Sequence, residues 1–189
     1  MIISLSGAPG SGKSTIAMML ADKLSWPRYY IGGLRREIAQ KRHLTIAEYN
    51  KLGESDPSTD KEVDDYLKRL GKEQDDFLVE SRTAWFFIPH SFKIYLDAEE
   101  NEAAKRIFKQ LQGENSRNEG SPPQSLESVI SGIKERVESD DFRYKKYYNI
   151  DYRAKTNYDF YLDTSNLTPA EVFEAVYNRV KSELDNKKK

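Results

Sequence analysis

Short apolar runs alternate along this chain with longer segments in which apolar residues recur every three or four positions. The alternation predicts an α/β protein, because strands that each lead into a helix build a parallel sheet covered on both faces. Strands are expected at residues 1–6, 29–31, 77–80, 92–96 and 158–162. Helices are expected at residues 13–23, 34–41, 46–52, 56–70, 99–111, 125–147 and 168–184. The fourth of these helices should begin with Asp56 as its N-cap and stop at Gly71.

Composition sets further limits on the kind of protein. The 189 residues suit one domain, and the longest apolar stretch, residues 84–89, is far too short to cross a membrane. Thirty basic residues nearly balance 31 acidic ones, so the net charge of −1 gives no reason to expect nucleic acid or an anionic membrane as a partner. The chain contains no cysteine, which fits a reducing compartment, and we expect a cytoplasmic protein. The polar, glycine- and proline-containing segment at 113–125 predicts a long loop, either functional or disordered.

Residues 7–14, GAPGSGKS, match the phosphate-loop pattern G-x-x-x-x-G-K-[ST] between a predicted strand and a predicted helix. The glycines allow the backbone to bend so that successive N–H groups point into one concavity, and the helix adds the positive end of its dipole. Lys13 is expected to reach the outer phosphates of a nucleoside triphosphate, and Ser14 to offer its hydroxyl to Mg²⁺. The predicted ATP contacts in this loop are Gly7, Ala8, Pro9, Gly10, Ser11, Gly12, Lys13, Ser14 and Thr15. The loop by itself predicts phosphate binding and leaves the phosphate acceptor open.

Further motifs follow the phosphate loop in a fixed order across nearly the whole chain. They are GLRREIA at 33–39, DPSTD at 56–60, ESR at 80–82, RY at 143–144, YNID at 148–151, YD at 158–159 and DTS at 163–165. In this set the chain resembles the cytidylate kinases, most closely the short archaeal-type enzymes of the nucleoside monophosphate kinase superfamily. The resemblance implies the reaction of ATP with CMP or dCMP to give ADP and CDP or dCDP, with Mg²⁺ as the cofactor.

The resemblance also implies an architecture, the three-layer fold of P-loop NTPases around a parallel five-stranded sheet. The core would comprise residues 1–31, 76–110 and 157–185. A helical insertion that binds the monophosphate would span about 32–75, and a lid about 111–147. The expected partners are small-molecule nucleotides, bound by a monomer.

Arginines carry most of the residue roles that the resemblance implies. Two phosphate anions must be brought together, and a guanidinium group binds phosphate oxygens in pairs. Arg36 and Arg82 match the arginines that bind the acceptor phosphate. Arg136 and Arg143, seven positions apart and so on one helix face, match lid arginines that act with Lys13 in catalysis. Without the resemblance, the two lid arginines read as a solvated stripe of charge.

Three further residues complete the expected site. Glu80 fits a carboxylate that holds Mg²⁺ through water, with an ion pair to Arg82 as the alternative. Arg106 is a candidate contact to the phosphate or base of the donor. Asp60, with Asp64 on the same helix face, is a candidate to accept hydrogen bonds from the cytosine amino group or from an arginine. Tyr144, Tyr147, Tyr148 and Tyr152 are candidates to stack on a base, but we expect them instead to pack the helix at 125–147 against the body.

Two alternatives remain open beside a cytidylate kinase. One is a P-loop kinase for AMP, UMP or a small metabolite, and the other is a nucleotide-binding switch with little turnover. The set of arginines argues against the switch, which needs no clamp for an acceptor. Three positions depart from the pattern of the family: Leu34 stands where relatives often carry an acidic residue, and Ser81 and Asn149 each replace a glycine.

Overall fold

The structure is a computed structural model that describes residues 1–112 and 125–187. In that part of the chain, five parallel strands form one sheet in the order β2-β3-β1-β4-β5. The strands are β1 (Ile2–Gly7), β2 (Arg28–Tyr30), β3 (Phe77–Glu80), β4 (Phe92–Asp97) and β5 (Phe160–Asp163). The predicted parallel sheet is confirmed, and every strand lies close to its expected position. The predicted loop at 113–125 lies outside the described residues except for Ser125, and so do residues 188–189.

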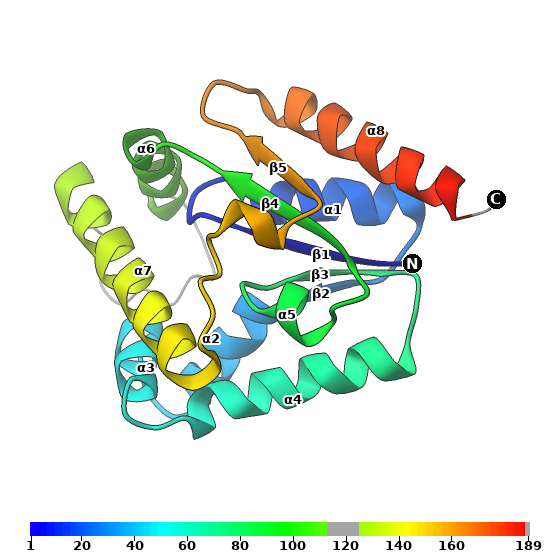
Figure 1. The fold of residues 1–189 in the computed structure, drawn as a ribbon. Helices are drawn as coiled ribbons and strands as arrows, with labels where there is room; N and C mark the ends of the chain where they lie inside the picture. Colours follow the sequence, from blue (N-terminus) through cyan, green and yellow to red (C-terminus); the bar gives the residue numbers. More distant parts are fainter. Residues whose placement is uncertain (113–124, 188–189) are drawn as a thin grey trace.

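Helices cover both faces of this sheet, which gives the three layers that the sequence predicts (Figure 1). They are α1 (Lys13–Leu24), α2 (Ile31–Lys41), α3 (Ile46–Gly53), α4 (Ser58–Glu73), α5 (Ala84–Phe87), α6 (Glu100–Leu111), α7 (Leu126–Tyr148) and α8 (Pro169–Asn186), with a 3₁₀ turn at Lys155–Asn157. No helix within residues 1–112 and 125–187 is long and apolar enough to cross a membrane.

The two faces of the sheet follow from the alternation of side chains along each strand. Ile3 and Leu5 of β1 point to the face covered by α1 and α8, where Val176 is also fully buried. Phe77 and Val79 of β3 point to the opposite face, in a second cluster supplied mainly by α2, α4 and α5. Burial on both faces explains why the central strands β1, β3 and β4 read as mostly apolar runs.

Helix starts carry the signals expected of them. Thr45 at α3 and Thr168 at α8 each form a capping box with the glutamate three residues later, and Ser125 forms the equivalent box at α7. From this start α7 packs first against α6 and then, in its second half, against α3 (Figure 1). It thereby reaches from the β4 side of the molecule to the helices inserted between β2 and β3.

Three local expectations need correction. The helix α4 continues through Gly71 to Glu73. Gly71 is a packing residue and not a helix stop, since a Cβ atom there would lie 2.9 Å from the Ile88 side chain. The N-cap of α4 is Pro57, and Asp56, one residue earlier, accepts a hydrogen bond from the Ser58 amide at 2.9 Å. The short helix α5 was not predicted, because four residues are too few to show a helical period.

Candidate active site

The phosphate loop has the backbone that its glycines allow. Gly10 has a φ of 74° and its Cα lies against α6, where an added Cβ would be 2.5 Å from the carbonyl oxygen of Ala103. Gly12 has a φ of 83° and is the N-cap of α1. Both conformations are left-handed and unfavourable for other residues. The loop is therefore bent tightly around the N-terminus of α1, where helix amides attract anions.

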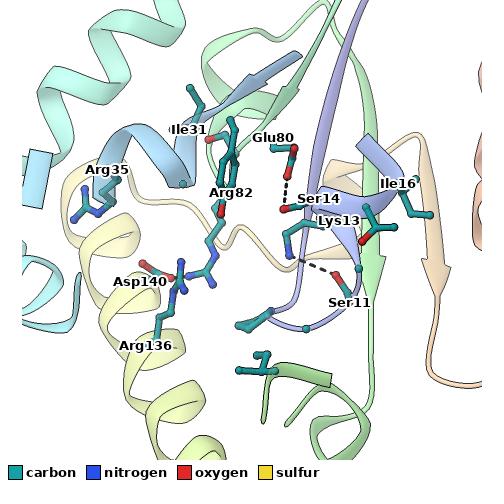
Figure 2. Close-up of a pocket in the computed structure, with 18 of the residues that line it drawn as sticks. Ser11, Lys13, Ser14, Ile16, Ile31, Arg35, Glu80, Arg82, Arg136 and Asp140 are labelled. Atoms are coloured by element: carbon teal, nitrogen blue, oxygen red, sulfur yellow. Dashed lines mark hydrogen bonds and ion pairs between the residues drawn. The ribbon is translucent and has the colours of Figure 1, made fainter. Parts of the chain in front are cut away.

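The side chains of the loop fold back over it. The Ser11 hydroxyl donates to the carbonyl oxygen of Ala8 at 2.9 Å, and the Lys13 ammonium donates to the same carbonyl and to Ser11 Oγ, the latter at 3.4 Å (Figure 2). The ammonium thus lies beside the loop amides. Lys13 and the loop present their positive charge in one place.

Ser14 and Glu80 meet where β3 ends beside the first turn of α1. The Ser14 hydroxyl donates to Glu80 Oε2 at 2.8 Å (Figure 2). Glu80 is buried and also pairs with Arg28. The alternative ion pair of Glu80 with Arg82 is not formed, because Arg82 pairs elsewhere. A hydroxyl and a carboxylate are hard oxygen donors suited to Mg²⁺. Within the described residues no three His, Cys, Asp or Glu side chains cluster as metal ligands, so an ion here would need water and phosphate oxygens as well, which Mg²⁺ prefers.

One cavity of about 780 Å³ joins the loop to the surrounding helices. Its volume lies in the range of nucleotide- and cofactor-sized sites. Of the residues predicted to form the site, the cavity is lined by Pro9, Gly10, Ser11, Gly12, Lys13, Ser14, Thr15, Arg36, Asp60, Glu80, Arg82, Arg106 and Arg136. Among the described residues, Gly7, Ala8 and Arg143 are the predicted ones that do not line it.

Arg36 and Arg106 stand on different walls of this cavity. Arg36 is buried in α2, and its Nη1 donates to Tyr30 Oη at 2.9 Å and to the carbonyl oxygen of Gly32 at 3.0 Å. Arg106 of α6 donates through Nη2 to the carbonyl oxygens of Thr164 and Ser165, at 2.9 and 3.1 Å. Arg106 therefore fixes the turn after β5 to the edge of the cavity.

Arg82 and Arg136 converge from opposite sides. Arg82 follows β3 and forms an ion pair with Asp140 of α7, while Arg136, one turn earlier on α7, points toward the same carboxylate (Figure 2). A carboxylate placed between two guanidinium groups offsets their repulsion in a site where water screens little. Asp140 was not singled out in the sequence, where it lies among many acidic residues of α7.

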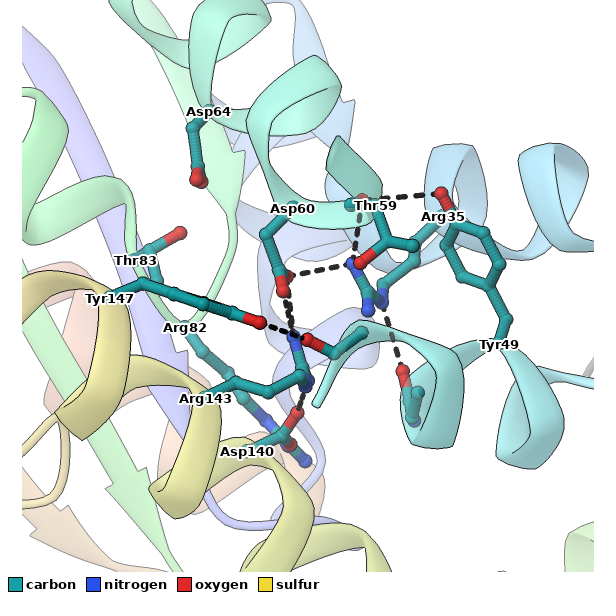
Figure 3. A network of polar contacts seen from close by, with 12 residues as sticks. Arg35, Tyr49, Thr59, Asp60, Asp64, Arg82, Thr83, Asp140, Arg143 and Tyr147 are labelled. Carbon is teal, nitrogen blue, oxygen red and sulfur yellow. Dashed lines mark hydrogen bonds and ion pairs between the residues drawn. The ribbon is translucent and has the colours of Figure 1, made fainter. Parts of the chain in front are cut away.

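Arg143 occupies a different environment from Arg136. Its side chain is fully buried and pairs with Asp60 and with Asp140, including a bond from Nη1 to Asp60 Oδ2 of 2.6 Å (Figure 3). Arg35 joins them by donating to Asp60 Oδ1 at 2.8 Å. We call this set the buried ion network, formed by Arg35, Asp60, Arg82, Asp140 and Arg143. It ties α2, α4 and α7 to the end of β3.

Asp64 lies one turn after Asp60 on α4, and it also lines the cavity. It is only 4% exposed and accepts a hydrogen bond from the Tyr148 hydroxyl of α7. Burial raises the pKa of Asp64 to about 7. Tyr148 also contacts Phe87 and Tyr144, so the tyrosines of α7 do pack this helix against the body as expected.

A parallel sheet, a strand–loop–helix phosphate site and cations gathered around one cavity define the chain as a P-loop phosphotransferase. More specifically, it belongs to the cytidylate kinase-like family, whose family model matches residues 2–166. This confirms the family that the sequence motifs indicate.

Individual relatives agree with this assignment. The chain is 37% identical to a cytidylate kinase of Halobacterium salinarum over 95% of its own length and 89% of that protein. It is 28% identical to a cytidylate kinase of Methanobrevibacter smithii over 96% and 99%. Among solved structures, a shikimate kinase from Bacteroides thetaiotaomicron superposes with a TM-score of 0.63 and 14% identity over 98% of both chains, a likeness of fold.

Proposed function

We propose that this protein transfers the γ-phosphoryl group of ATP to CMP or dCMP, giving ADP and CDP or dCDP. The observation that carries the proposal is that one cavity holds both a phosphate loop and a separate set of arginines. The phosphate loop would bind the triphosphate donor. The arginines would bind the phosphate of a second, acceptor molecule. Cytidylate kinases among the relatives support CMP as the acceptor.

On the donor side, the loop amides, Lys13 and Thr15 bind the triphosphate, and Arg106 borders the donor base or phosphates. Lys13, which lines the cavity beside the loop, stabilises the transferred group. Its charge is in position before the reaction, and it stabilises the transition state more strongly in a cavity that excludes water than it would in solution.

On the acceptor side, Arg36 and Arg82 bind the phosphate of the monophosphate. Arg136 reaches the cavity from α7 and stabilises the transferred group together with Lys13. Arg143 was expected beside them as a catalytic residue. Since its guanidinium is engaged by Asp60 and Asp140, we propose that it acts as a positioning residue that holds the walls of the acceptor site.

Ser14 and Glu80 would hold Mg²⁺, which when bound neutralises phosphate charge and orients the donor. The helices α2 to α4 would serve as the acceptor-binding insertion, about 32–75, and the segment about 111–147 as the lid. We place the enzyme in the cytoplasm, as a monomer acting on small-molecule nucleotides. The cysteine-free composition agrees with a reducing compartment.

A panel of acceptors tests the proposal directly. The purified protein is incubated with ATP and Mg²⁺ and with CMP, dCMP, UMP, AMP or small alcohols including shikimate, and ADP release is measured. We expect the highest kcat/KM with CMP or dCMP. A higher value with AMP or an alcohol would identify a different acceptor. Tight ATP binding without transfer to any of them would instead indicate a nucleotide-binding switch.

A further inference from the structure

Asp64 is a buried carboxylate that lines the cavity. Phosphate binding and transfer give it no role. It shares one face of α4 with Asp60, yet the two have different partners. Asp60 is occupied by Arg35 and Arg143, whereas Asp64 accepts a single hydrogen bond, from Tyr148, in the part of the chain that the structure describes. A carboxylate has room for about four hydrogen bonds, so Asp64 keeps acceptor capacity that Asp60 has used.

The surroundings of Asp64 suit a nucleobase better than a phosphate. The lining of the cavity that Asp64 shares includes Ile31, Val63 and Tyr144, which are buried and mostly apolar. In Figure 3 the Asp64 carboxylate lies apart from the guanidinium groups gathered at Asp60. A flat apolar ring with a polar edge fits between such walls, with its edge toward the carboxylate.

We infer that Asp64 reads the amino edge of the acceptor base, accepting a hydrogen bond from N4 of cytosine and excluding the O4 carbonyl of uracil. This inference rests on the proposed function and deepens it, since it names the residue that separates CMP from UMP. Cytosine presents a donor at this position, and carboxylates accept from it, whereas O4 of uracil is an acceptor that would face the carboxylate lone pairs. A buried site built for one pattern rejects the other because its polar groups remain unpaired.

Tyr148 supports this reading as a positioning residue. Its hydroxyl holds one oxygen of the carboxylate, and its ring is fixed by Phe86, Phe87 and Tyr144. The carboxylate is therefore presented from α4 but oriented from α7. Base recognition would thus depend on α7 being in place, as phosphate contact through Arg136 does.

The decisive variant is Asp64→Asn, because it keeps the size of the side chain and adds an amide donor. We compare kcat/KM for CMP with kcat/KM for UMP. We expect their ratio to fall by about tenfold or more, because N4 of CMP loses its acceptor and O4 of UMP gains a donor. Asp65→Asn is the matched control, on the same helix but with a side chain that is 50% exposed, and should leave the ratio unchanged. Tyr148→Phe, which removes only the hydroxyl, should lower the ratio by a few-fold.

A change in the substrate complements the change in the protein. The monophosphate of 2-pyrimidinone riboside lacks the amino group, and wild-type enzyme should use it about tenfold less efficiently than CMP. The Asp64→Asn variant should show a much smaller difference between the two substrates. If this variant does not fold, the comparison of the two substrates with wild-type enzyme still tests the inference. Equal use of the two substrates by wild type, or an unchanged CMP-to-UMP ratio in folded Asp64→Asn, would overturn the inference while CMP kinase activity stands. If wild-type enzyme phosphorylates neither CMP nor UMP, the proposed function itself is wrong, and this inference with it.

Discussion

The phosphate loop and the buried ion network bind charge in opposite ways. The loop uses main-chain amides and one ammonium from eight consecutive residues, and its conformation is set by local glycines. The network uses side chains from α2, α4, α7 and the end of β3, and these meet only after the chain has folded. Side chains of a binding site that is formed by consecutive residues should therefore be replaceable with little effect on the fold. A function assembled from distant elements is also part of what holds the fold together.

The loop and the network should also differ in their contribution to the free energy of unfolding. Lys13 and Ser14 are at least partly accessible, so they contribute little to the free energy of unfolding. Arg143 is fully buried, and Asp60 and Asp140 are 3–4% exposed. Removing one partner of a buried pair leaves the other charge desolvated and uncompensated. Substitutions in the loop should therefore lower activity, and substitutions in the network should lower stability.

Replacing Lys13 by alanine should lower kcat by about 10³-fold or more, because a preorganised cation on the transferred group is lost. The free energy of unfolding, measured in urea, should change by less than about 0.5 kcal/mol. Lys105→Ala, with a side chain 63% exposed on α6, is the control and should retain full turnover. Near-normal turnover in Lys13→Ala would contradict the role of the loop.

Replacing Arg143 by alanine should reduce the free energy of unfolding by about 3–5 kcal/mol, because Asp60 and Asp140 lose a shared counter-charge. The matched variant is Arg153→Ala. It breaks an ion pair with Asp141 whose side chains are 51% and 34% exposed, and it should cost about 0–1 kcal/mol. Urea denaturation of both variants measures the difference. Similar losses in the two would mean that the network does not stabilise the protein.

Replacing Arg36 by alanine should raise the KM for the acceptor by roughly 10–100-fold and leave the KM for ATP unchanged, since a charged hydrogen bond to phosphate is worth about 1.5–3 kcal/mol. Arg42→Ala, at the exposed C-terminal end of the same helix, is the control. Initial rates at varied CMP and varied ATP separate the two constants. An unchanged acceptor KM would remove Arg36 from the acceptor site.

The same contrast explains what could be predicted from the sequence. The sheet and the loop were predictable, because buried parallel strands are continuous apolar runs and the loop pattern is contiguous. The different environments of Arg136 and Arg143 were not. Their spacing of seven places both on one face of a helix, but the long packing surface of α7 puts the first at the cavity and the second between α3 and α4.

Asp140 and Gly71 are two further residues whose roles depend on contacts that are distant in sequence. Asp140 precedes Arg143 by three residues, a spacing compatible with a pair on a helix, but α7 offers several such pairs on its exposed side. Only tertiary contact shows that this carboxylate also pairs with Arg82, which follows β3. Gly71 was misread for the same reason, since its neighbour Ile88 is distant in sequence. Sequence patterns report local geometry, and the proposed acceptor side of this site is made of non-local contacts.

The smallest expected effect concerns the pH dependence of base choice. The groups around Asp64 are Tyr148 on α7, Asp60 and Lys68 on α4, and Arg35 on α2, and burial raises the pKa of Asp64 to about 7. Below this pH the carboxyl group is protonated and can donate to O4 of uracil, so discrimination weakens. Above it the carboxylate only accepts, and cytosine is favoured.

The ratio of kcat/KM for CMP to that for UMP should therefore increase by a few-fold, at most about tenfold, from pH 6 to pH 8, as the ionised fraction rises from about a tenth to about nine tenths. Taking a ratio cancels pH effects on phosphoryl transfer that both substrates share. In Asp64→Asn the ratio should be flat over the same range, because no group at that position titrates. A slope of equal size in the variant would assign the titration to another residue. A flat wild-type profile would mean that base choice is determined by groups whose charge does not change between pH 6 and pH 8.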